Sequence, residues 1–221
     1  MHDRLTLSDV PKDARGIVLM LHGGAEYSQR PVDHRSLALR RTRAMFRSLT
    51  EPLNDAGYAV GLLRFVVKGW NAEPGGVPSP VRDARLALRD LHTEHPDLPV
   101  LLLGHSMGAR TSVAVADEPG VVGVVGLAPW FPADEPITAL TGKHLVTVHG
   151  SRDRITSPKA SRIFTERAAS VAASVNYLAL PGRGHYMLSG AGDWNRIALT
   201  ESLAVLENAT CAASRRGDET A

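Results

Sequence analysis

The sequence Gly-His-Ser-Met-Gly at residues 104–108 constrains this chain more than any other feature. It follows an apolar run at 99–103 and leads into a helix-compatible run at 109–117, so a strand, a G-x-S-x-G turn and a helix are predicted in that order. In so tight a turn, a side chain at either glycine position would collide with neighbouring backbone. The segment therefore predicts a nucleophile elbow, which holds the hydroxyl of Ser106 clear of the sheet edge.

Length and composition indicate one globular domain. The 221 residues, of which 43% are hydrophobic, are enough for one sizeable core, and we expect a single domain over residues 1–208. The remaining tail, 209–221, is rich in small and charged residues without an apolar face, and we expect it to be disordered.

Charge and cysteine content exclude several classes of partner. A formal net charge of +2 is too small to indicate a nucleic-acid surface or a polybasic membrane tether. The single cysteine, Cys211, allows no disulfide within the chain. The N-terminus lacks the apolar core of a secretory signal, and no apolar run approaches the roughly 18 residues of a membrane span. We therefore expect a soluble, cytoplasmic protein that binds neither nucleic acid nor membrane.

Six short aliphatic runs alternate with amphipathic stretches, a pattern typical of an α/β fold. The runs lie at 16–21, 58–65, 99–103, 121–127, 144–149 and 174–180. Between them, Val81, Ala84, Leu88 and Leu91 recur at helical spacing, and the stretches 158–172 and 193–207 have the same character. This predicts a mostly parallel twisted sheet with helices on both faces. Functional residues in such sheets gather at the carboxyl ends of the strands.

A serine nucleophile needs a base, and His185 is the best placed of the nine histidines. It lies in a glycine-rich loop directly after the sixth run. His22 and His149 each precede a glycine at a strand end, where we expect them to support a loop by hydrogen bonding.

The third member should be a carboxylate that orients the imidazole. Asp153 follows the fifth run after a tight glycine turn, and Asp134, after the fourth run, is the alternative. We favour Asp153 because the tight glycine turn fixes its position, and Ser106, Asp153 and His185 also follow the chain order typical of hydrolases with a nucleophile elbow.

An oxyanion hole requires two preorganised N–H donors. The elbow supplies the amide of Met107. The second donor is predicted in the segment 21–25 after the first run, with Gly24 as the first choice and Ala25 as the second.

Together these motifs resemble the α/β-hydrolase superfamily. The resemblance rests on His22-Gly23-Gly24, the elbow, His149-Gly150 with Asp153, and Gly184-His185, in the order of that superfamily, and it spans about residues 16–206. It implies a cofactor-free serine hydrolase acting on esters, thioesters or amides. No metal is expected, because the histidines and acids lack the paired ligand spacings of zinc sites. Relatives with a lid insert it between the fourth and fifth runs, and here that connection, 128–143, is short, so no lid domain is expected.

Two groups of residues could select the substrate. Aromatic side chains near the carboxyl edge could line an acyl or aryl pocket or else fill the core, and they are Tyr27, Trp70, Trp130 and Tyr186, with Ala25 beside them. Six arginines lie between residues 30 and 47, at positions 30, 35, 40, 41, 43 and 47. They could form a solvated helix face, or face the site and hold an anionic substrate or an acidic acyl carrier protein.

The leading hypothesis is an esterase for small carboxylic esters that works through an acyl-enzyme intermediate. A thioesterase or cyclase of a biosynthetic pathway, acting on a carrier-bound or CoA-type acyl group, is the alternative. A non-catalytic ligand-binding member of the fold is the third.

Overall fold

The computed structural model describes residues 4–72 and 76–218 and contains a seven-stranded sheet in the order β1-β3-β2-β4-β5-β6-β7. Every neighbouring pair is parallel except β1 with β3. The strands are β1 (Leu5–Leu7), β2 (Gly16–Leu21), β3 (Tyr58–Leu63), β4 (Val100–His105), β5 (Val121–Leu127), β6 (His144–Gly150) and β7 (Ser174–Leu180).

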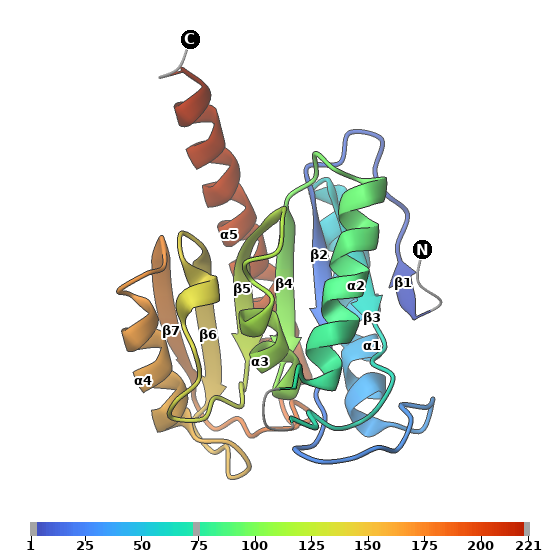
Figure 1. The fold of residues 1–221 in the computed structure, drawn as a ribbon, viewed down its shortest axis with the longest axis vertical. Coiled ribbons are helices and arrows are strands. Elements are labelled where there is room, and N and C mark those ends of the chain that lie inside the picture. Colours follow the sequence, from blue (N-terminus) through green and yellow to red (C-terminus); the bar gives the residue numbers. More distant parts are fainter. Residues whose placement is uncertain (1–3, 73–75, 219–221) are drawn as a thin grey trace.

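Helices cover both faces of this sheet. In Figure 1, α2, α3 and α4 lie in front of the sheet, while α1 and α5 lie behind it. The helices are α1 (Leu37–Asp55), α2 (Ser79–Glu94), α3 (Met107–Ala114), α4 (Pro158–Ala168) and α5 (Ala191–Asp218). The carboxyl ends of the parallel strands share the lower edge of the sheet in Figure 1, so the loops after β2, β4, β6 and β7 meet there.

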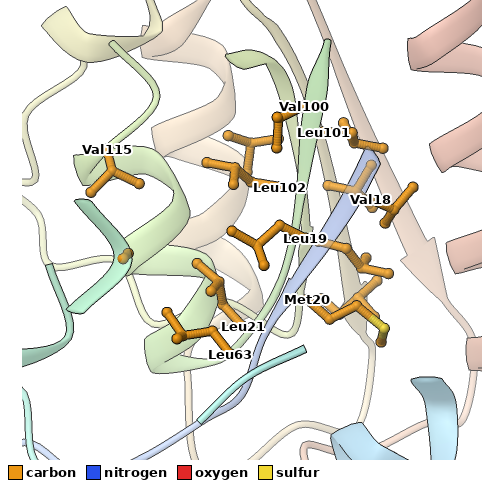
Figure 2. Close-up of a cluster of buried hydrophobic side chains, with 14 of the residues drawn as sticks. Val18, Leu19, Met20, Leu21, Leu63, Val100, Leu101, Leu102 and Val115 are labelled. Atoms are coloured by element: carbon orange, nitrogen blue, oxygen red, sulfur yellow. The ribbon is translucent and has the colours of Figure 1, made fainter. Parts of the chain in front are cut away.

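The core is centred on β2 and β4, whose residues are all buried. Aliphatic side chains leave these strands on both sides of the sheet and pack under the two helix layers (Figure 2). The sequence of a strand that is buried on both faces is a continuous aliphatic run. These segments therefore lack the alternation of apolar and polar residues seen in half-buried strands. The α/β fold class is therefore confirmed.

The strand predictions agree with the structure within two residues at each end. One strand escaped prediction, because β1 has three residues, Leu5–Leu7, and is too short to give an alternating pattern. The connection from β5 to β6 contains only one 3₁₀ turn, Thr138–Leu140, so the expectation of no lid domain is also confirmed.

The C-terminal segment differs from the sequence expectation. We expected residues 209–221 to be disordered, yet α5 continues through Asp218, and 219–221 lie outside the described residues. Ala209, Ala212 and Ala213 are strong helix formers, and they extend a helix that packing has already nucleated. No helix among the described residues is both long and apolar enough to cross a membrane.

Candidate active site

Ser106 occupies the turn between β4 and α3. Its φ of +54° falls in the left-handed region that L residues rarely adopt. The flanking glycines make this turn possible, since a Cβ on Gly104 would lie 2.5 Å from the backbone of Ala109 and a Cβ on Gly108 would lie 2.2 Å from the carbonyl oxygen of Leu21. The predicted strand–turn–helix geometry is present, and it presents the Ser106 hydroxyl at the carboxyl edge of the sheet.

His185 reaches Ser106 from the loop after β7. Its Nε2 lies 3.1 Å from Ser106 Oγ, and its Nδ1 lies 2.8 Å from Oδ2 of Asp153, which follows β6. The structure thus brings together three side chains that are far apart in the chain. Asp134, the alternative acid, is exposed in a turn and has no such contact among the described residues.

The carboxylate of Asp153 accepts five hydrogen bonds. Oδ2 accepts from His149 Nε2, His185 Nδ1 and the Thr156 hydroxyl, and Oδ1 accepts from the amides of Ile155 and Thr156. Burial acts to raise the pKa of Asp153, but the hydrogen bonds from His149, His185 and the two amides outweigh it and hold the pKa far below its ordinary value. Asp153 is therefore ionised at neutral pH.

An ionised Asp153 fixes the tautomer of His185. A carboxylate can only accept, so Nδ1 of His185 carries the proton and donates it to Oδ2. Nε2 then presents its lone pair to Ser106, whose hydroxyl donates across the 3.1 Å contact. This is the arrangement that a general base needs in order to take a proton from a serine.

The loop after β2 packs against the elbow and leaves two amides available. A Cβ on Gly24 would lie 2.4 Å from Cε of Met107, so no side chain fits there and the backbone of Gly24 approaches the start of α3. Within the described residues, no hydrogen bond occupies the N–H of Gly24 or Met107. The amide of Ala25, our second choice, donates instead to the carbonyl oxygen of Lys68 at 2.8 Å and is not available to a substrate.

His22 supports this loop, as expected. Its Nε2 accepts from the amide of Phe65 at 3.2 Å, and its Nδ1 donates to the carbonyl oxygen of Gly23 at 2.7 Å. Burial, only partly offset by the bond to Gly23, lowers the pKa of His22 to about 4. His149 also has a supporting role, since its ring joins Asp153 to Ser161.

The buried His22 predicts a loss of stability in mild acid. His22 stays neutral in the fold but gains a proton near pH 6.5 when the chain unfolds, so its contribution is complete above that pH and is lost as the pH falls towards about 4. We expect His22 to account for a decrease of about 2 kcal/mol in the free energy of unfolding between pH 7 and pH 5. Urea unfolding across this range should show a shallower pH dependence for His22→Gln. The exposed His34, changed to Gln, should keep the wild-type slope, and equal slopes for all three proteins would contradict the assignment.

A pocket of about 540 Å³ opens beside Ser106. Its floor is Gly23, Gly24, His105 and Ser106, one wall is the first half of α1, and the opposite wall is the loop that follows His185. Of the aromatic candidates, Tyr186 lines the pocket and packs edge-on against His185. Tyr27 is 70% exposed and is not among the lining residues.

Two other aromatic candidates serve the scaffold. Trp70 and Trp130 hold the guanidinium of Arg110 between them, with ring centroids 4.1 and 4.5 Å from its carbon, and Arg110 also pairs with the buried Glu135. Trp70 and Trp130 are not among the residues that line the pocket, and neither is Ala25, which bridges to Gly69. Cation–π contact explains why these two rings turn away from the pocket.

Two residues of the site, Thr156 and His105, were not predicted from the sequence. Thr156 bonds to Asp153 and lies 3.1 Å from His185 Nδ1. His105 donates from Nε2 to the carbonyl oxygen of His185, and burial lowers its pKa to about 3. Arg41, one of the six arginines for which the sequence left a solvated face or a site-facing role open, lines the pocket and is buried. Thr156 follows the end of β6 by a few residues, which is a signal that the sequence does contain. The burial of Arg41 depends on how α1 packs against the loop after β7 and against α5.

Comparison with solved structures identifies the fold. An α/β serine hydrolase homologue from Coxiella burnetii superposes with a TM-score of 0.65 at 16% identity, over 89% of this chain and 90% of that chain. The chain has the α/β-hydrolase fold. An α/β serine hydrolase without a lid from Xanthomonas campestris matches this chain with a TM-score of 0.58 at 18% identity, over 88% of this chain and 85% of that chain.

Other comparisons agree with this placement. Est1E from Butyrivibrio proteoclasticus, solved with ferulic acid bound, matches this chain with a TM-score of 0.63 at 15% identity, over 92% of this chain and 96% of that one. Residues 44–147 match the family model described as serine aminopeptidase, S33. No curated protein matches the chain by sequence.

Proposed function

We propose that this chain is a serine hydrolase that cleaves small carboxylic esters through an acyl-enzyme intermediate. The observation that carries the proposal is the hydrogen-bonded series from Ser106 Oγ through His185 to Asp153, with contacts of 3.1 and 2.8 Å. Ser106 lies at a pocket, and residues 4–72 and 76–218 include no lid domain, so a small ester can approach Ser106 from solvent.

The first half-reaction forms the acyl-enzyme. Oγ of Ser106 attacks the ester carbonyl carbon while its proton passes to Nε2 of His185, and the negative charge on the carbonyl oxygen is held by the amides of Gly24 and Met107. The bond to the alcohol oxygen then breaks, and the alcohol leaves with the proton from His185.

The second half-reaction restores the enzyme. Water gives a proton to His185 as its oxygen attacks the acyl carbon, and the ester bond to Ser106 breaks when His185 returns that proton to Oγ. Asp153 stabilises the imidazolium that forms in each step. Its five hydrogen bonds keep it ionised, so it holds His185 in position without taking the proton itself.

The position of Ser106 at a helix start adds electrostatic support. The amide of Met107 is the first N–H of α3, where unpaired amides and the helix dipole favour negative charge. Together with the unoccupied amide of Gly24, it is positioned to stabilise an oxyanion that forms beside Ser106.

Labelling by a fluorophosphonate tests the proposal directly. Because an activated serine attacks the phosphorus and retains it, we expect rapid, stoichiometric labelling, with the adduct located on Ser106 by peptide mass spectrometry. The same protein should release p-nitrophenol from p-nitrophenyl hexanoate, and prior labelling should abolish that release. A folded protein that neither labels nor turns over the ester would overturn the proposal.

A further inference from the structure

The pocket beside Ser106 contains a buried cation, Arg41. Arg41 lies on α1, is 9% exposed, and lines the pocket together with Leu37 and Ala44 from the same helix face. Among the described residues, no carboxylate lies within 4.0 Å of its guanidinium. Burying an unpaired charge is costly, so its presence next to the nucleophile calls for an explanation.

Neutral contacts hold Arg41 in place but leave much of its hydrogen-bonding capacity unused. Nε donates to the carbonyl oxygen of Met187 at 3.0 Å, and one Nη2 hydrogen donates to Oδ1 of Asn195 at 3.1 Å. A guanidinium has five N–H donors, so others remain available to a ligand in the pocket. Burial lowers the pKa of Arg41, and no acidic side chain offsets that effect.

Apart from Ser106, His105, His185 and the two arginines, the side chains that line the pocket are apolar. Leu37, Ala38, Ala44, Tyr186 and Leu188 form the walls, and three of these, Leu37, Tyr186 and Leu188, are large side chains exposed around the opening. Arg40 lines the same pocket and is exposed. An occupant that complements this surface has an apolar body and one anionic end.

We propose that Arg41, with Arg40 at the rim, forms a carboxylate subsite, so that the preferred substrates are esters that carry an apolar chain or ring and a carboxylate. The inference rests on the proposed function and names a substrate class for the same site. The planar guanidinium fork matches the geometry of a carboxylate, which it can bind through two parallel hydrogen bonds. In a pocket with apolar walls, such a charged pair is weakly screened.

Two pairs of matched esters test the subsite. The first compares mono-p-nitrophenyl adipate with p-nitrophenyl hexanoate, which places the carboxylate on the acyl side. The second compares 4-acetoxybenzoate with 4-acetoxybenzamide, which places it on the alcohol side. In at least one pair we expect kcat/KM to favour the anionic ester by about tenfold or more, the effect of one charge-assisted contact.

Variants on α1 separate recognition from structural support. In Arg41→Met the ratio of kcat/KM for the anionic ester to kcat/KM for the neutral ester should fall to about one. Arg41→Lys should keep part of the preference for the anionic ester. Arg47→Gln is the matched control, because Arg47 lies on the same helix but does not line the pocket, and its ratio should equal that of the wild type. Loss of the contact to Met187 would slow both esters of a pair equally, so the ratio reports the subsite alone.

The outcomes distinguish this inference from the proposed function. If the wild type hydrolyses the neutral esters but shows no preference in either pair, or if Arg41→Met leaves the preference unchanged, the carboxylate subsite is overturned and the esterase stands. If the wild type hydrolyses none of the four esters and does not label with a fluorophosphonate, both are overturned. If Arg41→Met fails to fold, the kcat/KM ratios of the wild type and of Arg41→Lys still test the carboxylate subsite.

Discussion

Replacing Ser106 with alanine should lower kcat for p-nitrophenyl hexanoate by about 10⁴-fold or more, while the free energy of unfolding changes little. The variant removes one oxygen atom, so it leaves no nucleophile for His185 to activate. Stopped-assay kinetics with active-site-titrated wild type as the reference would measure the effect. The residual rate should resemble that of a variant in which Ser106, His185 and Asp153 are all replaced, since residues that act as one unit lose their effect together.

Controls for this prediction come from the chain itself. Ser170, an exposed serine whose hydroxyl bonds only to the carbonyl oxygen of Arg167, offers a matched Ser→Ala change away from the site. Ser170→Ala should keep both fluorophosphonate labelling and full turnover. A Ser106→Ala variant that retained labelling, or that turned the ester over within about tenfold of the wild-type rate, would show that another residue is the nucleophile.

The backbone geometry of the elbow accommodates alanine at position 106, so the variant should fold as the wild type does. Ser106 is held at φ +54° by the sheet and helix on either side, and its amide donates to the carbonyl oxygen of Leu127. Alanine tolerates this conformation no worse than serine, since both have a Cβ and neither is branched. Circular dichroism and urea unfolding of the variant should therefore match those of the wild type.

The sequence was enough to predict the residues that meet at Ser106, because each is tied to a local signal. Ser106, Asp153 and His185 all follow an aliphatic run, and the ends of parallel strands converge at one edge. The strand order and the antiparallel β1 required long-range pairing that no local pattern encodes.

Side chains whose role depends on a distant partner could not be assigned from sequence. Trp70 and Trp130 are residue types that often line a substrate pocket, but here both rings contact the guanidinium of Arg110 from α3. The sequence leaves open whether the arginines at 30–47 form a solvated face or face the site. In the structure, some of them line the pocket and others do not. Arg40 and Arg41 line the pocket, and Arg43 and Arg47 do not. Helical position alone cannot make that division, because it depends on the loop after β7 and on α5.

Changing Asp153 to asparagine should lower kcat by about 10⁴-fold, for a reason different from that of the Ser106 variant. An asparagine that turns its NH₂ towards His185 would force Nδ1 to become the acceptor, and the proton would move to Nε2. His185 could then no longer accept the proton of Ser106. The nucleophile remains in place, so fluorophosphonate labelling should be slowed by a similar factor rather than abolished.

The same variant should change stability in a pH-dependent way. The lowered pKa of Asp153 means that its stabilising contribution is complete above the unfolded-state pKa, near 4, and is lost as the pH falls through the lower folded-state pKa. Asp153→Asn should thus be less stable than the wild type at pH 7, and the difference should narrow in urea unfolding below about pH 4. Asp134→Asn, which removes an exposed carboxylate, should match the wild type in both rate and stability. Full activity of a folded Asp153→Asn variant would show that Asp153 does not orient His185. A loss of rate in Asp134→Asn instead would assign that role to Asp134.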